Sequence, residues 1–407
     1  MPHAPDDGRP GSTGPAVAAR PALSRLVGDT DDFAGTTWGR GPLLRPSADP
    51  AGFDDLLTAS AVDELLGQRG VRTPFLRVAK AGSTLPNGSF TAPAGVGAGI
   101  ADQVSDDKLT ALFADGSTIV LQALHRVWPP VIDFCQQLAA DLGHPVQANA
   151  YVTPPQNQGF DDHYDVHDVF VLQVAGRKKW SIHAPVLPSP LRDQPWTDRR
   201  DDVRRAAEQE PVIEAVLEPG DALYLPRGYL HSATALGGVT IHLTLGVHSW
   251  TRHAVAEELV GLALDRLSDD EQARGSLPLG TGLDADDIDS DVVAQLLRAA
   301  LDSLDPAEVA ARMRARRRGT QRAAPVGPLA QHELATTLAD DTVVRLREYV
   351  DATLADTTIT SRVAPVVVDD APVDVVRRVL AGEPVTAADL GHDTARRMIE
   401  AGLVVRG

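Results

Sequence analysis

The sequence contains little cysteine, no long apolar run and no excess of basic charge. Cys135 is the only cysteine among 407 residues, so an intrachain disulfide and a cysteine-based zinc site are excluded. No uninterrupted apolar stretch is long enough to cross a bilayer, and the first residues lack the apolar centre of a secretion signal. These features favour a reducing cytoplasm and predict no membrane-spanning helix.

The formal net charge of -18 disfavours general nucleic-acid binding, because such binding relies on basic surface that displaces phosphate counterions. The one candidate basic patch is the arginine cluster between residues 312 and 318, which also suits the solvated face of a helix. An acidic surface attracts a basic protein or peptide substrate, although acidity alone also serves solubility. Nucleic acid is therefore not an expected partner.

The N-terminal half is expected to begin with a disordered tail over residues 1–30, because Met1 to Ala22 is rich in proline, glycine, alanine and aspartate. Apolar residues at helical spacing then predict a helix over 54–67, which ends at a glycine. A second helix is predicted over 131–142, with Gly143 just after it.

Short strands broken by proline and glycine are predicted from residue 147 onward. We expect them at 149–153, 169–174, 180–183, 212–217, 222–225 and 240–247, with a tight turn at 218–221. Many short strands with turn residues between them indicate a jelly roll or barrel. The segment 184–202 is long and holds several prolines, so we expect it to overhang the barrel.

The C-terminal part is predicted to be mainly helical. Amphipathic spacing indicates helices over 255–262 and 293–304 and a third from Pro306 into the arginine cluster. From about residue 342, a strand, helices at 373–380 and 393–401 and a strand at 403–405 are typical of a small winged-helix module. The fold class expected is therefore α+β, with domains at 31–250, 251–335 and 336–407.

A candidate metal site comes from His163 and Asp165. Residues two apart in a strand project from the same face, so the imidazole and the carboxylate can reach one ion. His231, which follows the Pro226-Arg227-Gly228 segment, is the best third ligand. Two histidines and one carboxylate form the facial triad that binds iron(II) with open positions.

Alternative interpretations of these histidines remain. A lone histidine and aspartate two apart more often form a surface ion pair or a satisfied core pair. His167 would replace a ligand if the strand register slipped by two, whereas His242 and His248 suit core or supporting positions. Two features strengthen the metal interpretation: the cationic run Gly176 to Trp180 lies downstream, and Asn149 and Tyr151 share a face of the preceding strand.

The central hundred residues resemble the ribosomal oxygenase branch of the JmjC oxygenases. The similar residues run from Asn149 to Trp180: Asn-Ala-Tyr-Val-Thr-Pro-Pro, Gly-Phe, His-Tyr-Asp, Phe-Val-Leu-Gln and Gly-Arg-Lys-Lys-Trp. The similarity continues over 223–231 and 241–244. The resemblance implies a double-stranded β-helix of the JmjC/cupin kind over 31–250, a helical dimerisation region over 251–335, a winged-helix domain over 336–407, and a homodimer.

The resemblance also implies roles for site residues. It makes His163, Asp165 and His231 the iron ligands and pairs Lys178 with the distal carboxylate of 2-oxoglutarate. Tyr151 is implied to hydrogen-bond the same carboxylate. Asn149 is implied to line the cosubstrate pocket, with Thr244 a weaker addition. Lys179 points to the opposite face of a strand, so we expect it to be solvated.

The activity implied is hydroxylation of an amino-acid side chain in a protein by iron(II), 2-oxoglutarate and O₂. For the family the target is a histidine or arginine of a ribosomal protein. Gly246 departs from the polar residue of histidine-hydroxylating relatives, so a peptide or a small natural product stays open as substrate. A second hypothesis is a non-enzymatic cupin-like regulator that places its C-terminal module on DNA. Acidic residues outnumber basic ones from Asp340 onward, which favours protein contacts for that module.

Overall fold

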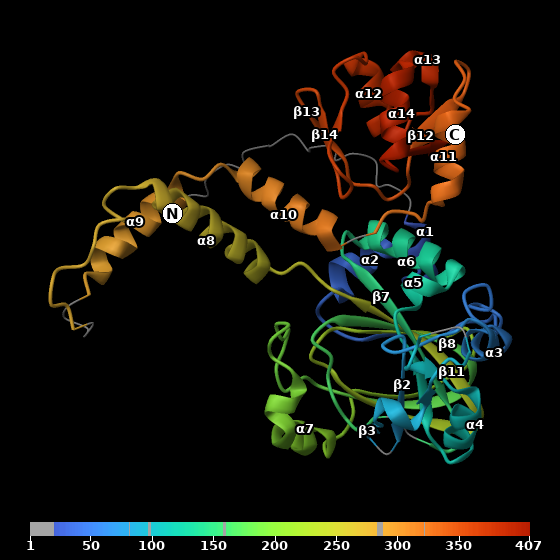
Figure 1. Ribbon diagram of the computed structural model, residues 1–407. Coiled ribbons are helices and arrows are strands. Elements are labelled where there is room, and N and C mark those ends of the chain that lie inside the picture. The colour runs from blue at the N-terminus through green and yellow to red at the C-terminus, as the bar shows by residue number, and fades with distance from the viewer. Residues whose placement is uncertain (1–19, 81, 97–98, 158–159, 283–287, 321) are drawn as a thin grey trace, which may run out of the picture.

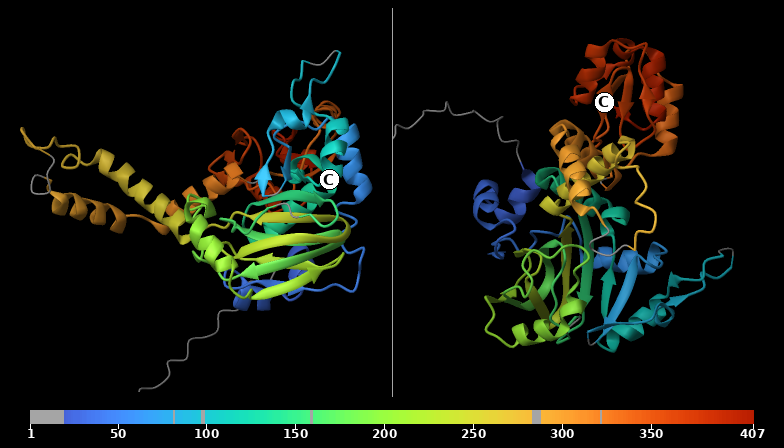
Figure 2. Two further views of the ribbon diagram at one scale, coloured as in Figure 1. Left: turned by 90° about the horizontal axis from the view of Figure 1, so that it is seen from below. Right: turned by 90° about the vertical axis from the view of Figure 1, so that its left-hand side faces the viewer.

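The structure is a computed structural model that describes residues 20–80, 82–96, 99–157, 160–282, 288–320 and 322–407. Three regions follow one another along the chain: a barrel with N-terminal helices, a helical arm and a C-terminal unit (Figure 1). The arm projects sideways and the C-terminal unit stands at one end of the barrel (Figure 2). No helix of the described residues has the length and apolar character needed to cross a membrane.

The barrel is built from a nine-stranded sheet in the order β1-β10-β8-β11-β7-β6-β2-β3, with β9 paired to β8. All its strand pairs are antiparallel. The strands are β1 (Leu43–Arg45), β2 (Leu76–Lys80), β3 (Ser83–Thr84), β6 (Thr118–Leu121), β7 (Val146–Thr153), β8 (Asp168–His183), β9 (Ile213–Leu217), β10 (Ala222–Leu225) and β11 (Leu230–Val247). Every strand predicted between residues 147 and 250 therefore exists.

Two predicted strands, 169–174 and 180–183, are one continuous strand, so the break predicted at Gly176 is wrong. Gly176 has a φ of +66°, and a Cβ there would lie 2.2 Å from the carbonyl oxygen of Val239. The register against β11 shifts at this point, so the glycine forms a bulge and the strand continues beyond it. The predicted strand 240–247 is likewise only the second half of β11.

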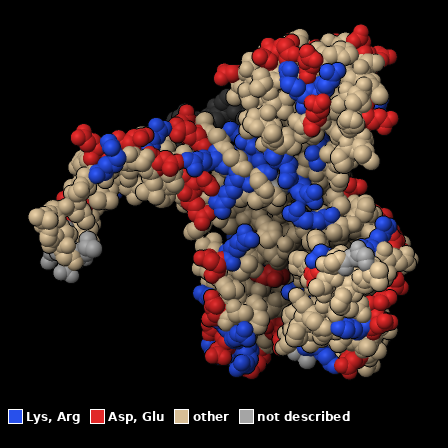
Figure 3. Space-filling model, viewed as in Figure 1, with Lys and Arg blue, Asp and Glu red and all other residues tan. Residues whose placement is uncertain are grey.

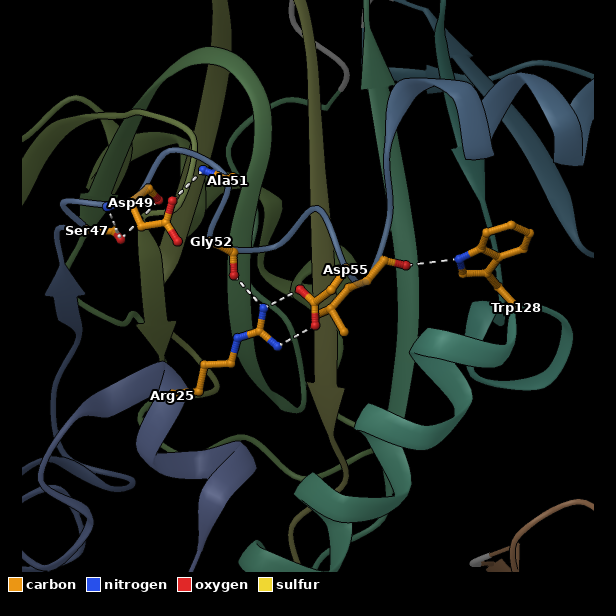
Figure 4. Close-up of polar contacts among 8 residues, drawn as sticks. Arg25, Ser47, Asp49, Ala51, Gly52, Asp55 and Trp128 are labelled. Atoms are coloured by element: carbon orange, nitrogen blue, oxygen red, sulfur yellow. Dashed lines mark hydrogen bonds and ion pairs between the residues drawn. The ribbon is translucent and has the colours of Figure 1, made fainter.

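The disordered tail was predicted to end at residue 30, but regular structure begins at Pro21. Residues 1–19 of the predicted tail lie outside the described residues. Helix α1 (Pro21–Val27) buries Ala22, Leu23 and Leu26 against the core. The Arg25 guanidinium binds the Asp55 carboxylate and the Gly52 carbonyl (Figure 4). The predicted disordered tail, residues 1–30, therefore extends too far along the chain. Residues 21–27 form a helix instead, because the apolar side of α1 packs against the core.

Helices from the N-terminal part of the chain pack against the sheet. The predicted helix 54–67 is α3 (Ala59–Gln68), which begins later because the Thr58 side chain accepts the Ala61 N–H. The predicted helix 131–142 is α6 (Pro129–Leu142), followed by Gly143 in the left-handed conformation. The remaining elements of this region are α2 (Thr30–Asp32), β4 (Thr91–Ala92), β5 (Gln103–Val104), α4 (Asp106–Ala114), α5 (Leu124–Val127) and α7 (Arg200–Ala207).

The arm consists of α8 (Arg252–Asp269), α9 (Ser290–Asp302) and α10 (Pro306–Thr320). Arginines of α10 form ion pairs with carboxylates of other elements: Arg312 with Asp265, Arg316 with Glu257 and Glu258, and Arg317 with Asp351. These pairs favour the solvated-face interpretation of the arginine cluster over a nucleic-acid patch.

The C-terminal unit has its own hydrophobic core. A three-stranded sheet in the order β16-β12-β17 packs with helices, and a second small sheet has the order β13-β14-β15. Helix α11 and the second sheet were not predicted. The elements are α11 (Pro328–Thr336), β12 (Val343–Leu346), β13 (Thr353–Ala355), β14 (Thr358–Thr360), β15 (Val366–Val367), α12 (Val373–Leu380), β16 (Val385–Thr386), α13 (Ala387–Leu390), α14 (His392–Glu400) and β17 (Val404–Arg406).

Candidate metal centre

His163, Asp165 and His231 lie together at one end of the barrel. Their ligand atoms are all within 4.8 Å of one another, and His231 Nε2 is 3.8 Å from Asp165 Oδ2. The two imidazole rings have centroids 4.4 Å apart. Two nitrogens and one carboxylate oxygen at this spacing suit a single divalent transition metal.

Main-chain pairing holds the two histidines side by side although they are far apart in sequence. The His231 N–H donates to the His163 carbonyl at 2.8 Å, and the His163 N–H donates to the His231 carbonyl at 3.3 Å. The two residues thus form an isolated antiparallel bridge. Asp165 reaches the same site from two residues beyond His163, although residues 163–165 do not form the expected strand and His163 alone makes a bridge there.

The hydrogen bonds of the ring nitrogens determine which of them faces an ion. His163 Nδ1 lies 2.7 Å from the Asp161 carbonyl oxygen, and His231 Nδ1 lies 3.1 Å from the Tyr229 carbonyl oxygen. A carbonyl only accepts, so each Nδ1 carries the hydrogen and each Nε2 keeps its lone pair. Metal-binding histidines are commonly oriented in this way.

The segment before His231 is anchored by the buried carboxylate of Asp168. This carboxylate accepts from the Tyr224 hydroxyl at 3.3 Å and from the Arg227 N–H at 3.1 Å. Gly228 donates its N–H to the Asp165 carbonyl at 3.0 Å. Its φ is +94°, and a Cβ would lie 2.5 Å from the Leu187 carbonyl oxygen, so glycine is required here.

The electrostatics of the three groups suit cation binding. Burial alone raises the pKa of Asp165, but His167, His231, His163 and Arg77 together hold that pKa below its usual value. Burial, followed by the neighbouring His163, lowers the pKa of His231 to about 4. An ionised carboxylate and a neutral imidazole are the forms that bind a metal, so the residues present fit iron(II).

A cavity adjoins these ligands inside the barrel and contains an unusual cation. Its lining includes Lys178, which is only 4% exposed. Burial lowers the pKa of Lys178 to about 7. Its Nζ lies 3.5 Å from Thr153 Oγ1 and 5.9 Å from the centre of the Trp180 ring. Within the described ranges no carboxylate lies within ion-pair distance of Lys178, so the cavity is suited to an anionic ligand.

The other predicted cosubstrate residues differ in placement. Tyr151 and Thr244 line the cavity, but Asn149 is not among the lining residues. The Asn149 side-chain oxygen instead accepts the N–H of Ala123 at 3.0 Å, where the chain has a positive φ. Lys179 lies on the opposite face of β8, with 46% of its side chain exposed and Glu214 2.9 Å away.

The remaining histidines lie outside the ligand group. His167 is 3.2 Å from Gln147 Nε2 and packs edge-on against His248 at 5.3 Å, so it does not replace a ligand. His242 lines the cavity and stacks on the Tyr151 ring at 4.8 Å. Burial, with Lys178 and His231 nearby, lowers the pKa of His242 well below its usual value.

Two residues near the site were missed by the sequence interpretation. Arg77 on β2 lies over the Phe160 ring at 5.1 Å and donates to the Tyr151 hydroxyl at 3.5 Å. Phe160 lines the cavity. Nothing in the local sequence around Arg77 marks it, because its position depends on the pairing of β2 with β6 and of β6 with β7.

Comparison with known proteins gives a family match. Residues 127–255 match the JmjC domain family. A bifunctional lysine-specific demethylase and histidyl-hydroxylase NO66 of Aedes aegypti is 29% identical over 228 residues, which are 54% of this chain and 33% of that protein. Ribosomal oxygenase 1 of Homo sapiens is 38% identical over 142 residues, which are 34% of this chain and 21% of that protein. The chain thus spans a third or less of the length of these two relatives.

Solved structures agree on the fold. The ribosomal oxygenase YcfD of Escherichia coli has a TM-score of 0.54 at 15% identity, with 94% of this chain and 99% of that chain covered. A structure of YcfD in complex with cobalt and 2-oxoglutarate has a TM-score of 0.53, with 93% and 98% covered. The predicted α+β fold with a JmjC/cupin barrel is confirmed.

Proposed function

From the premise that this chain carries a JmjC domain related to those of ribosomal oxygenases, we propose that it is an iron(II)- and 2-oxoglutarate-dependent oxygenase. The observation that supports this most directly is the group His163, Asp165 and His231 beside a cavity with a buried ammonium that forms no ion pair with any described residue. The three ligands leave coordination positions open for a keto acid and O₂. The ammonium of Lys178 gives a dicarboxylate a charged partner at its far end.

The protein residues act by binding, orienting and excluding water. His163 and His231 hold the ion through Nε2, and Asp165 holds it through a carboxylate oxygen. Lys178 neutralises the distal carboxylate of 2-oxoglutarate, and Tyr151 donates its hydroxyl to the same group. Burial is the main cause that raises the pKa of Tyr151, so this hydroxyl stays protonated at neutral pH. Val169, Val171 and Trp180 supply apolar walls.

The reaction is a balanced four-electron reduction of O₂. When bound, iron(II) supplies the oxygen activation that 2-oxoglutarate oxidation drives. One oxygen atom enters a substrate C–H bond to give an alcohol, and the other enters succinate as CO₂ leaves. The residues above hold the keto acid and keep the cavity dry.

We propose a side chain of a ribosomal protein, histidine or arginine, as the substrate. The names of the relatives, ribosomal oxygenase and histidyl-hydroxylase, support this class. The net charge of -18 favours encounter with a basic protein. Gly246 offers no side chain at the barrel wall, and a Cβ there would lie 3.1 Å from His167 Nε2.

We also propose that the arm forms a homodimer and that residues 336–407 act as a winged-helix-like module for protein contacts. Apolar side chains of the arm are exposed, with Leu264 at 56% and Val293 at 55%. A second copy is the partner that would cover them. Light scattering of Leu264→Asp checks this proposal, because a variant as dimeric as the wild type contradicts it.

Succinate formation with iron(II) and 2-oxoglutarate tests the function, with and without ribosomal proteins. Asp165→Ala should lose at least about 100-fold in turnover and lose iron, while its circular dichroism stays unchanged. Asp162→Ala, three residues before, removes a carboxylate outside the ligand group and is the matched control. Persistent turnover in Asp165→Ala contradicts the ligand assignment.

A further inference from the structure

Arginines gather where the C-terminal unit meets the barrel. Arg126 comes from α5, Arg322 follows α10, Arg347 follows β12, and Arg362 lies between β14 and β15; we name these four the junction arginines. Figure 3 shows basic side chains concentrated in the middle of this face, between the barrel and the C-terminal unit, where α10 with its own arginines also ends. Such a concentration is unexpected in a chain with a net charge of -18.

The main chain at this junction is held in place. Gln136 of α6 donates its side-chain N–H to the Ala323 carbonyl at 2.7 Å. Arg347 Nε donates to the Ala324 carbonyl at 2.5 Å, and the Ala324 N–H donates to the Glu348 carbonyl at 2.9 Å. Arg322 is therefore presented from a segment docked on both the barrel helices and the C-terminal unit.

Three of the junction arginines, Arg126, Arg322 and Arg347, lack the carboxylate partners that the α10 arginines have among the described residues. Among the described residues, no carboxylate lies within ion-pair distance of Arg126, Arg322 or Arg347. Burial lowers the pKa of Arg362, and Arg322 and Arg126 lower it further. Positive charges gathered in this way repel one another, and an anion bound at Arg126 and Arg322 would relieve that repulsion.

A recess of about 420 Å³, including its open mouth, lies beside Arg126 and Arg322. His125 lines it, and because His125 Nδ1 accepts the Ala148 N–H at 3.0 Å, its Nε2 carries the hydrogen and donates. No carboxylate is among the lining residues. The apolar part of the lining consists of Ile132, Cys135, Ala139, Pro145 and Val146.

We propose that Arg126 and Arg322 bind a short segment of single-stranded RNA, with one phosphate held between these two guanidinium groups and the adjacent base on the apolar floor of the recess. Guanidinium groups bind phosphate oxygens in a two-pronged geometry. A positively charged groove follows the backbone of single-stranded nucleic acid, and the aliphatic floor of the recess offers the base van der Waals contact in place of aromatic stacking. The acidic surface elsewhere repels a long polyanion, so the segment that binds is short.

Fluorescence anisotropy of a labelled single-stranded RNA of about ten nucleotides tests this. The double variant Arg126→Ala/Arg322→Ala should weaken binding about tenfold or more at low salt. It should also reduce the slope of log affinity against log salt by about 0.7, the value for one lost phosphate contact on a single strand. The lysine pair Arg126→Lys/Arg322→Lys keeps the charge and should recover most of the salt slope.

Arg266→Ala/Arg312→Ala is the matched control, because it also removes two positive charges, from arm arginines that are paired with Glu308 and Asp265. An equal loss in this control overturns the proposal, since the effect would then follow net charge alone. Polyglutamate of the same length and a free mononucleotide are tested as competitors. Competition by polyglutamate as effective as by unlabelled RNA overturns the proposal in favour of an acidic peptide. Equal competition by the mononucleotide, mole for mole, overturns it in favour of a free nucleotide.

The proposal does not rest on the oxygenase chemistry. Succinate formation without protein substrate should be unchanged in Arg126→Ala/Arg322→Ala, because neither arginine lines the metal cavity. RNA binding by a chain without 2-oxoglutarate turnover would remove the proposed function and leave this inference standing. Turnover without RNA binding would do the reverse.

Discussion

Lys178 in the barrel cavity and Arg126 and Arg322 at the junction have no carboxylate within ion-pair distance among the described residues, but they differ in burial. Lys178 is 4% exposed, and burial lowers its pKa to about 7. Arg126 and Arg322 are exposed, so water hydrates both guanidinium groups. A buried lone cation therefore demands one small anion in one orientation, whereas an exposed group of cations accepts an extended one.

Removing the buried cation, Lys178, should have the largest effect of the changes to these cations. Lys178→Ala should raise the KM for 2-oxoglutarate about 100-fold, because a charge-assisted contact inside a dry cavity is lost; this is about 3 kcal/mol. Titrating 2-oxoglutarate in the succinate assay measures it. Lys179→Ala removes the neighbouring, solvated ammonium and should change KM less than about twofold. Equal effects of the two variants would contradict the assignment of Lys178.

The affinity for 2-oxoglutarate should depend on pH through the charge of Lys178. The pKa of Lys178 in the ligand-free protein is about 7, so the ammonium is charged below that pH and neutral above it. The dicarboxylate binds the charged form, so its affinity should fall as pH rises above 7, by up to about tenfold per pH unit. Binding above pH 7 should take up a proton, which calorimetry in buffers of different ionisation enthalpy detects.

Two of the histidines that line the cavity, His231 and His242, do not titrate in that window. Burial is the largest cause that lowers the pKa of His231, to about 4, and of His242, well below its usual value. Lys178→Met should therefore remove the pH dependence of 2-oxoglutarate binding between pH 7 and 9. A dependence that survives in Lys178→Met belongs to another group and contradicts this explanation.

The smallest expected effect concerns the exposed arginines. Arg322→Ala relieves repulsion and loses no ion pair with a described residue, so the free energy of unfolding should stay within about 0.5 kcal/mol of the wild type. Arg317→Ala loses the ion pair with Asp351, 2.6 Å away, and should lower it by about 0.5 to 1 kcal/mol. Chemical denaturation compares the two. A larger loss in Arg322→Ala would show that a junction arginine is neutralised after all.

The candidate ligands could be predicted from the sequence because local rules determine their placement. Alternation in an extended segment predicts His163 and Asp165 on one face, and the turn residues before His231 return the chain to the same end of the barrel. The choice between Lys178 and Lys179 follows from the same alternation once the family spacing is known. Burial of the first and exposure of the second agree with that choice.

Residues whose placement depends on distant pairing could not be predicted. Arg77 approaches Tyr151 across β6, which joins segments about seventy residues apart. Asn149 shares a strand face with Tyr151, yet its side chain holds the turn at Ala123 and does not line the cavity. The arginine cluster at 312–318 can be recognised in the sequence because its members are close together in the chain. Arg126 and Arg322 are far apart in the chain and come together only because the segment after α10 docks on α6.

The main-chain hydrogen bonds between His163 and His231 allow the protein to lose and rebind an ion without unfolding. They involve no side-chain atom that an ion would occupy, so a chelator that strips the metal leaves these two imidazoles adjacent. The metal-free protein therefore keeps two of its three ligands, His163 and His231, next to each other. Reloading needs only local adjustment of side chains, and repeated loss and recovery of iron is compatible with an intact barrel.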